Sequence, residues 1–318
     1  MLTTFRIKYA SLYKLRQMST ITSKDLYGSM TAMVTPMSKN GVVNYEQWKN
    51  LIQWQIKAET NAVVVAGTTG ESALLNLDEF KALLVIAVDC CQDTNTKVIA
   101  QTGHICPDDV IASNNIAFEV GADALLVVTP YYICTTQRGL FLHFEKIANA
   151  SDLPIILYNV PGRTQNDMLA KTTALLAKHN MIIGIKEATT DTSRIAELIR
   201  LLPKNFAVLS GNDDMFLQAM QDGACGVISV ASNIRPHTIK KICTFWALGD
   251  VISAKKCDSS LENLYKMLSC QPNPIPVKYL LHEAGQIGDG IRLPLVWYDE
   301  KISGSKLEIK KIIEETKL

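Results

Sequence analysis

Lys186 ends an otherwise apolar run, Met181-Ile182-Ile183-Gly184-Ile185-Lys186, and a lysine in that setting can do covalent chemistry. Burying an ammonium without a partner is costly, so a lysine there tends to lose its proton. The neutral amine is a nucleophile suited to forming a Schiff base with a ketone. The alternative is a lysine at a strand end, whose stem packs while its head reaches water and pairs with a carboxylate.

Polar segments at other expected strand ends bear on that choice. Gly67-Thr68-Thr69-Gly70-Glu71-Ser72 is a small-residue turn whose backbone N–H groups and threonine oxygens can receive a small carboxylate. A plain glycine turn with a Ser or Thr cap has a similar sequence. Arg163 follows another expected strand, where a guanidinium could clamp a second carboxylate, although a surface arginine is the simpler interpretation.

Tyrosines also stand at expected strand ends, in Thr129-Pro130-Tyr131-Tyr132 and at Tyr158. Tyrosines at such positions usually pack at a rim. The strand of Tyr158 directly precedes the strand of Lys186, so these two side chains are expected to be neighbours. A phenol beside an amine and a ketone can shuttle the protons that Schiff-base chemistry demands. Strand alternation turns Glu187 outward, away from this chemistry.

The elements that must position these residues alternate between short apolar, β-branched runs and segments of helical period. This alternation predicts a parallel sheet with crossover helices, and eight such units indicate a (β/α)₈ (TIM) barrel over 26–251. A helical appendage is predicted over 252–318, with helices at Val251–Leu268, Val277–Ala284 and Ser305–Thr316. The predicted strands are Ser29–Val34, Ala62–Ala66, Lys97–Thr102, Ala124–Thr129, Ile155–Asn159, Ile182–Lys186, Ala207–Ser210 and Gly226–Val230.

Composition excludes several classes of protein. The net charge of +1 provides no basic excess for nucleic-acid binding. The eight cysteines form no C-x-x-C pair and the five histidines are scattered, so reduced cysteines, a cytoplasmic location and no catalytic metal are expected. No apolar run reaches the roughly 20 residues of a membrane span. Residues 1–25 are expected to be a disordered extension or a non-native start; organelle targeting by the acid-free stretch 1–24 is the alternative.

Five motifs in this order closely resemble those of the dihydrodipicolinate synthase family. They are Gly67-Thr68-Thr69-Gly70-Glu71-Ser72, Pro130-Tyr131-Tyr132, Tyr158-Asn159-Val160-Pro161-Gly162-Arg163-Thr164, Gly184-Ile185-Lys186-Glu187-Ala188 and Gly226-Val227-Ile228-Ser229-Val230. The resemblance runs from about Tyr27 to the C-terminus, and Asn273-Pro274-Ile275-Pro276-Val277-Lys278 resembles the family's helical-domain signature. Each motif alone is weak, but their order at β/α spacing is highly specific.

The resemblance implies a role for each matching residue. Lys186 would form the Schiff base with pyruvate, and Tyr158 would donate and accept protons beside it. Thr68 and Tyr132 would complete a hydroxyl relay, with Tyr132 reaching into a neighbouring subunit of a homotetramer built as a dimer of dimers. The ligand contacts implied are Thr69 on the pyruvate carboxylate, Arg163 on the carboxylate of L-aspartate-4-semialdehyde, and the Ile228 carbonyl near the substrate.

The implied reaction condenses pyruvate with L-aspartate-4-semialdehyde to 4-hydroxy-tetrahydrodipicolinate, the entry step of the diaminopimelate and lysine pathway, with no cofactor beyond the covalent lysine. A related pyruvate aldolase, such as N-acetylneuraminate lyase or a 2-keto-3-deoxy-sugar-acid aldolase, stays an alternative, and a barrel that binds a metabolite without turnover is a more distant one. Weak or absent inhibition by lysine is also expected. The lysine-contacting positions implied by the family are apolar here at Leu77, Phe80 and Ile105.

Overall fold

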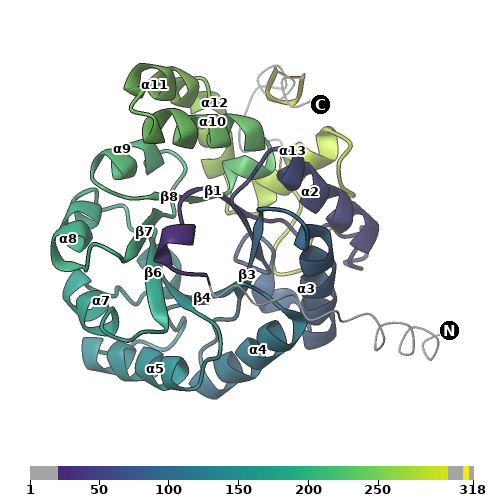
Figure 1. Ribbon diagram of the computed structural model, residues 1–318. Helices are drawn as coiled ribbons and strands as arrows, with labels where there is room; N and C mark the ends of the chain where they lie inside the picture. Colours follow the sequence, from purple (N-terminus) through teal and green to yellow (C-terminus); the bar gives the residue numbers. More distant parts are fainter. Residues whose placement is uncertain (1–20, 300–310, 315–318) are drawn as a thin grey trace.

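The structure, a computed structural model, describes residues 21–299 and 311–314. Eight parallel strands close into a barrel in chain order, with helices around the outside (Figure 1). The predicted TIM barrel is confirmed, and each strand ends within two residues of its predicted bound. The strands are β1 (Gly28–Ala32), β2 (Ala62–Val65), β3 (Lys97–Gln101), β4 (Ala124–Val128), β5 (Ile155–Asn159), β6 (Ile182–Glu187), β7 (Ala207–Ser210) and β8 (Gly226–Ser229).

Helices cover the outer face of the sheet between successive strands. Asn44 and Asn76 cap two of them, each accepting a hydrogen bond from a first-turn backbone N–H, and Asn76 forms a capping box with Glu79. The helices are α2 (Tyr45–Lys57), α3 (Leu77–Cys91), α4 (Pro107–Val120), α5 (Gln137–Asn149), α6 (Pro161–Thr164), α7 (Ala170–Leu176), α8 (Ser193–Leu201), α9 (Phe216–Gln221) and α10 (Pro236–Ala247).

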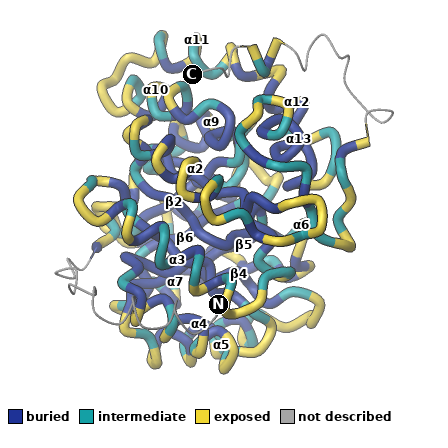
Figure 2. The backbone as a smooth tube through the Cα atoms, turned by 90° about the vertical axis from the view of Figure 1, so that its right-hand side faces the viewer, coloured by how far each residue is buried: buried dark blue, intermediate teal, exposed yellow. Residues whose placement is uncertain are grey.

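The barrel buries two separate apolar clusters. One fills its interior with inward side chains such as Met30, Val64, Leu126 and Ile228. The other lies between the strands and the surrounding helices. Because both faces of each strand are buried, the strands read as continuous apolar runs in the sequence. Figure 2 shows the buried strands enclosed by helices whose outer turns are exposed.

The C-terminal segment differs from its prediction at one point. The single helix predicted over 251–268 is two helices, α11 (Val251–Ser259) and α12 (Glu262–Ser269), followed by α13 (Ile275–Glu283). The break falls at Ser260 and Leu261, where the Ser260 hydroxyl donates to the Cys257 carbonyl at 2.6 Å. A serine that bonds the backbone in this way competes with continued helix. The helix predicted over 305–316 lies mostly outside the described residues; 311–314 are helical.

The predicted N-terminal extension falls mainly on residues 1–20, outside the described part of the chain. Its last residues, Ile21 to Asp25, lie within the described part. Ile21 is 3% exposed and belongs to the apolar cluster inside the barrel, and a short 3-10 turn, η1 (Ser23–Asp25), follows it. Burial of this side chain anchors the start of the described chain to the barrel.

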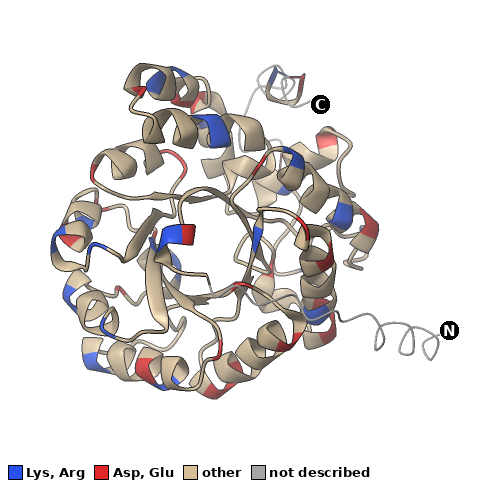
Figure 3. Ribbon diagram, viewed as in Figure 1, with Lys and Arg blue, Asp and Glu red and all other residues tan. Residues whose placement is uncertain are grey.

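The distribution of charge on the surface agrees with the near-zero net charge of the sequence. Lysine and arginine are intermixed with aspartate and glutamate over the outer helices (Figure 3). No helix in the described residues combines the length and apolar character needed to cross a membrane.

Candidate active site

A cavity of about 220 Å³ opens at the carboxyl end of the barrel. Its walls come from the ends of the strands, from the loops that follow them and from the C-terminal helices. Five of the predicted site residues line it, namely Thr68, Thr69, Tyr158, Arg163 and Lys186. A larger cavity of about 650 Å³, lined by residues such as Thr60, Asn95 and Lys97, contains none of them.

Lys186 and Tyr158 are neighbours, as the sequence predicted. They are paired in register on β6 and β5, and Lys186 Nζ lies 4.4 Å from the centroid of the Tyr158 ring. Lys186 is 5% exposed and Tyr158 is 6% exposed. The Tyr158 ring therefore lies directly beside the Lys186 amine, at the distance of a cation–π contact.

The backbone at Gly211 closes one side of the lysine. A Cβ added at Gly211 would lie 2.9 Å from Lys186 Cε and 2.6 Å from Ala188 Cβ. Both distances are shorter than real Cβ contacts, so any side chain at this position would require the lysine or Ala188 to shift. Gly211 therefore provides the space in which the extended Lys186 side chain lies.

The Thr68-Thr69 turn has the donors that a carboxylate receptor needs, and the binding role of Thr69 stays a prediction. Within residues 21–299 and 311–314, the backbone N–H groups of Thr68 and Thr69 donate no hydrogen bond. Thr69 Oγ1 accepts from Asn273 Nδ2 at 3.0 Å, which leaves its own O–H to donate to a ligand. The turn begins at Ala66, whose φ of 53° is unusual for a residue other than glycine. Converging N–H and O–H donors suit an anion.

A buried ion pair supports this turn from the C-terminal segment. Glu71 adopts a φ of 60°, and its side chain is fully buried against Lys278 Nζ of α13 at 2.5 Å. The Arg292 backbone N–H donates to the other carboxylate oxygen at 3.0 Å. Burial lowers the pKa of Lys278, and the Glu71 carboxylate opposes that change. The pair therefore fixes the carboxylate receptor to α13.

Arg163 lies at the rim of the cavity, on the short helix α6 that follows β5. Its Nη2 donates to the Asn273 carbonyl oxygen at 3.1 Å, and the residue is exposed. A guanidinium held in this way keeps other N–H donors for a second carboxylate. Thr69 and Arg163 thus contact the same residue, Asn273, from two sides.

Several cavity residues were given no role by the sequence. Asn273 and Tyr265 come from the C-terminal segment, and Asp213 follows β7. Asp213 Oδ2 accepts from the backbone N–H groups of Val230 and Ala231 at 3.0 and 2.9 Å. Burial raises the pKa of Asp213, and the charge of Lys186 acts in the opposite direction. The resemblance of Asn273-Pro274-Ile275-Pro276 to the family's helical-domain signature was the only feature of the sequence that drew attention to Asn273. It did not indicate which residues Asn273 contacts.

Two predicted site residues do not line the cavity. Tyr132 has a φ of 70° and is 88% exposed, so its side chain projects away from its own barrel. Ile228 is fully buried in β8 as part of the interior cluster, and Val230, the residue after that strand, lines the cavity. The predicted contact of the Ile228 carbonyl with substrate stays a prediction. Among the described residues, no group of three or more His, Cys, Asp or Glu side chains is arranged to hold a metal.

A closed (β/α)₈ barrel with a buried lysine on β6, a tyrosine beside it and N–H and O–H donors at the same mouth is the arrangement of a Schiff-base-forming lyase. The sequence matches the Dihydrodipicolinate synthetase family over residues 25–316, so the chain belongs to that family. The resemblance seen in the five motifs is confirmed.

Individual relatives agree with the family. The chain is 45% identical over 270 residues to the 4-hydroxy-tetrahydrodipicolinate synthase of Ectopseudomonas mendocina, covering 85% of this chain and 92% of that one. The enzyme of that name from Pseudomonas aeruginosa is 43% identical over the same shares. The crystal structure of a chloride-inhibited dihydrodipicolinate synthase from Acinetobacter baumannii, complexed with pyruvate, superposes with a TM-score of 0.87 at 39% identity, covering 91% of this chain and 98% of that chain.

Proposed function

We propose that this chain condenses pyruvate with L-aspartate-4-semialdehyde to give 4-hydroxy-tetrahydrodipicolinate, through a Schiff base on Lys186. The observation that carries this proposal is the buried Lys186 amine beside the Tyr158 ring, in a cavity that also holds Thr69 and Arg163. The named activity of the relatives supports the same reaction. The enzyme is a lyase that needs no cofactor beyond its own lysine.

The chemistry follows from the placement of these groups. Lys186 Nζ attacks the keto carbon of pyruvate, and loss of water gives an iminium. The iminium withdraws electrons from the methyl carbon, which loses a proton to become an enamine. The enamine carbon attacks the aldehyde carbon of the second substrate, whose oxygen takes up a proton; the substrate amine then displaces Lys186 and closes the ring. Tyr158 would carry these protons, and Thr68, which lines the same cavity, would take part in the relay.

The two carboxylates of the reacting pair have separate receptors. Pyruvate attached to Lys186 would place its carboxylate at Thr69, where N–H and O–H donors converge. The carboxylate of L-aspartate-4-semialdehyde would meet Arg163 at the rim. Holding both in one cavity turns a bimolecular step into an effectively intramolecular one.

Trapping of the intermediate tests the lysine. Incubation with pyruvate followed by borohydride reduction is expected to add the mass of a reduced pyruvate unit to the peptide that contains Lys186. Lys186→Ala is expected to remove the adduct while the protein still folds. Turnover of L-aspartate-4-semialdehyde, compared with sugar aldehydes, then identifies the acceptor. An adduct on another lysine, or preferred turnover of a sugar aldehyde, would contradict the proposal.

We also propose that the chain works in the cytoplasm as a homotetramer, a dimer of dimers in which Tyr132 enters the partner's cavity. Tyr132 is 88% exposed and its neighbour Ile133 is 51% exposed, which is apolar surface suited to an interface. Light scattering measures the assembly. Tyr132→Phe and Lys186→Ala subunits, each nearly inactive alone, are expected to recover about a quarter of wild-type activity after mixing, because half the dimers would contain one complete site. No recovery in mixed dimers would contradict the shared site.

A further inference from the structure

Behind the candidate active site, the outward faces of β5 and β6 carry a buried polar pair. Asn159 is fully buried and Glu187 is 3% exposed, and Asn159 Nδ2 donates to the two Glu187 oxygens at 3.1 and 3.0 Å. They are the residues directly after Tyr158 and Lys186, and they pair in the same register one step further along the strands. Strand alternation therefore places the catalytic pair on the inner face and this pair directly behind it.

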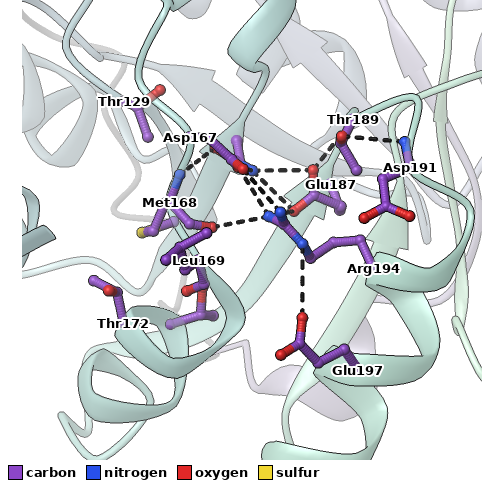
Figure 4. A network of polar contacts seen from close by, with 12 residues as sticks. Thr129, Asp167, Met168, Leu169, Thr172, Glu187, Thr189, Asp191, Arg194 and Glu197 are labelled. Carbon is purple, nitrogen blue, oxygen red and sulfur yellow. Dashed lines mark hydrogen bonds and ion pairs between the residues drawn. The ribbon is translucent and has the colours of Figure 1, made fainter. Parts of the chain in front are cut away.

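The polar pair continues into a network with Arg194 of α8 (Figure 4). Arg194 donates to both oxygens of Asp167, at 2.8 Å each, and its Nη1 lies 3.9 Å from Glu187 Oε2. Asn159 Nδ2 also donates to Asp167 Oδ1 at 2.9 Å. Arg194 is only 7% exposed, so these contacts form in a protected environment where hydrogen bonds to charged groups are strong.

The same network holds the loop that carries Arg163. This loop begins directly after Asn159, at the end of β5. It comes back into contact with Asn159 at Asp167 and Met168. Asn159 Oδ1 accepts from the Met168 backbone N–H at 2.9 Å, so the amide of Asn159 binds the returning end of the loop through its oxygen and its nitrogen. Asn159 thus contacts, through one side chain, the strand of Lys186 and the loop of Arg163.

We propose that Asn159, Glu187 and Arg194 are positioning residues for the reaction at Lys186: they set the alignment of Tyr158 with Lys186 and the place of the Arg163 loop. This inference rests on the proposed function. None of the three lines the cavity. They act through the backbone of β5 and β6, and a displacement of about 1 Å at reacting groups can cost roughly 100-fold in rate.

The charge of the network depends on Glu187. Burial raises the pKa of Glu187 to about 7, while hydrogen bonds from Asn159 and the Thr189 N–H and the charge of Arg194 act in the opposite direction. Three further carboxylates interact with Arg194: Asp167 before α7, Asp191 before α8, and Glu197 on α8, whose carboxylate lies 3.9 Å from Arg194 Nε. Protonation of Glu187 removes one negative charge and one acceptor site directly behind Lys186.

Three variants test the proposal against a matched control. Gln55 is equally buried, on α2, and makes three side-chain hydrogen bonds, with Thr31, Thr60 and Ser232. Gln55→Ala is expected to lower thermal stability while kcat and KM change less than about twofold. Asn159→Ala is expected to lower kcat about 10- to 100-fold and to raise KM for L-aspartate-4-semialdehyde more than KM for pyruvate. Arg194→Lys keeps the positive charge but loses the paired hydrogen bonds to Asp167. Its kcat is expected to lie between the kcat of Asn159→Ala and that of the wild type.

Glu187→Gln provides a readout that a purely structural role would not change. The amide is the neutral isostere, so the variant is expected to lack the component of the wild-type kcat pH profile that titrates near pH 7. Borohydride trapping with pyruvate alone keeps the two proposals separate: an untrapped wild type would defeat the proposed function. If the wild type is trapped, either of two results would overturn the positioning role. One is that Asn159→Ala has the same kcat and KM as Gln55→Ala. The other is that Glu187→Gln has the same kcat pH profile as the wild type.

Discussion

Replacement of Lys278 by methionine perturbs the support of the carboxylate receptor without touching the cavity. Methionine matches the length of the lysine stem, so the packing of α13 is largely kept. The change leaves the Glu71 carboxylate fully buried with the Arg292 backbone N–H at 3.0 Å and without its counter-ion. The cost of the substitution is therefore the cost of a buried charge that has lost its partner.

That cost can be estimated from measured behaviour of buried ion pairs. Removing one partner typically destabilises a protein by about 3–5 kcal/mol, whereas replacing both by apolar or neutral groups is often nearly neutral. For a chain of this size, 1 kcal/mol corresponds to about 2 °C in the melting temperature. Lys278→Met is expected to lower the melting temperature by roughly 6–10 °C, and Glu71→Gln combined with Lys278→Met is expected to recover most of that loss.

Thermal unfolding, followed by circular dichroism or calorimetry, measures both proteins. KM for pyruvate is the second measurement, because Glu71 lies only two residues after Thr69 in the same turn. The single variant is expected to raise this KM. A double variant less stable than Lys278→Met would refute the reasoning, since the loss would then come from packing and not from an unpaired charge.

Further predictions concern the cavity and its surroundings. Tyr158→Phe is expected to keep the fold and lose about 10²–10⁴-fold in kcat; full activity would remove the proton relay. Gly211→Ala, by displacing Lys186, is expected to slow borohydride trapping of pyruvate about tenfold or more; unchanged trapping would show that the backbone gives way. Burial raises the pKa of Glu187 from its ordinary 4.5 to about 7. Between these two pH values the folded protein holds a proton that the unfolded chain has released. The free energy of unfolding is therefore expected to fall by roughly 3 kcal/mol as the pH rises from 4.5 to 7. Glu187→Gln should lack that fall in a comparison of melting temperatures at pH 5 and pH 8. Lysine added to an activity assay is expected to inhibit weakly or not at all, and strong inhibition would contradict this expectation.

The barrel could be predicted from the sequence because its signals are local. Each strand is an apolar run, bounded by small or polar residues at the carboxyl end, and the capping residues Asn44 and Asn76 precede their helices directly. Lys186 could be predicted as a site residue because it is a charged residue at the end of an otherwise apolar run. Tyr158 followed from the order of the strands, since consecutive strands are neighbours in a parallel barrel.

The supports of the site could not be predicted, because their partners are far apart in the sequence. Lys278 lies 207 positions after Glu71, and Asn273 lies 204 positions after Thr69. No periodicity links such residues, and a buried Lys278 looks in the sequence like an exposed one. Asn159 ended a predicted strand and Glu187 followed one, and alternation predicted that Glu187 points outward, but nothing in the sequence indicated that both contact Arg194 or its partner Asp167.

The residues that support the candidate site come from two parts of the chain, the strands β5 and β6 and the C-terminal segment. In the proposed reaction the covalent step would depend on β5 and β6, which hold Tyr158 and Lys186 in register. The separation of the two proposed carboxylate receptors would depend on the C-terminal segment, since Thr69 accepts from the Asn273 side chain while Arg163 donates to the Asn273 carbonyl. A change in that segment would therefore alter which acceptor fits without affecting imine formation, so borohydride trapping and acceptor selectivity should respond to different substitutions.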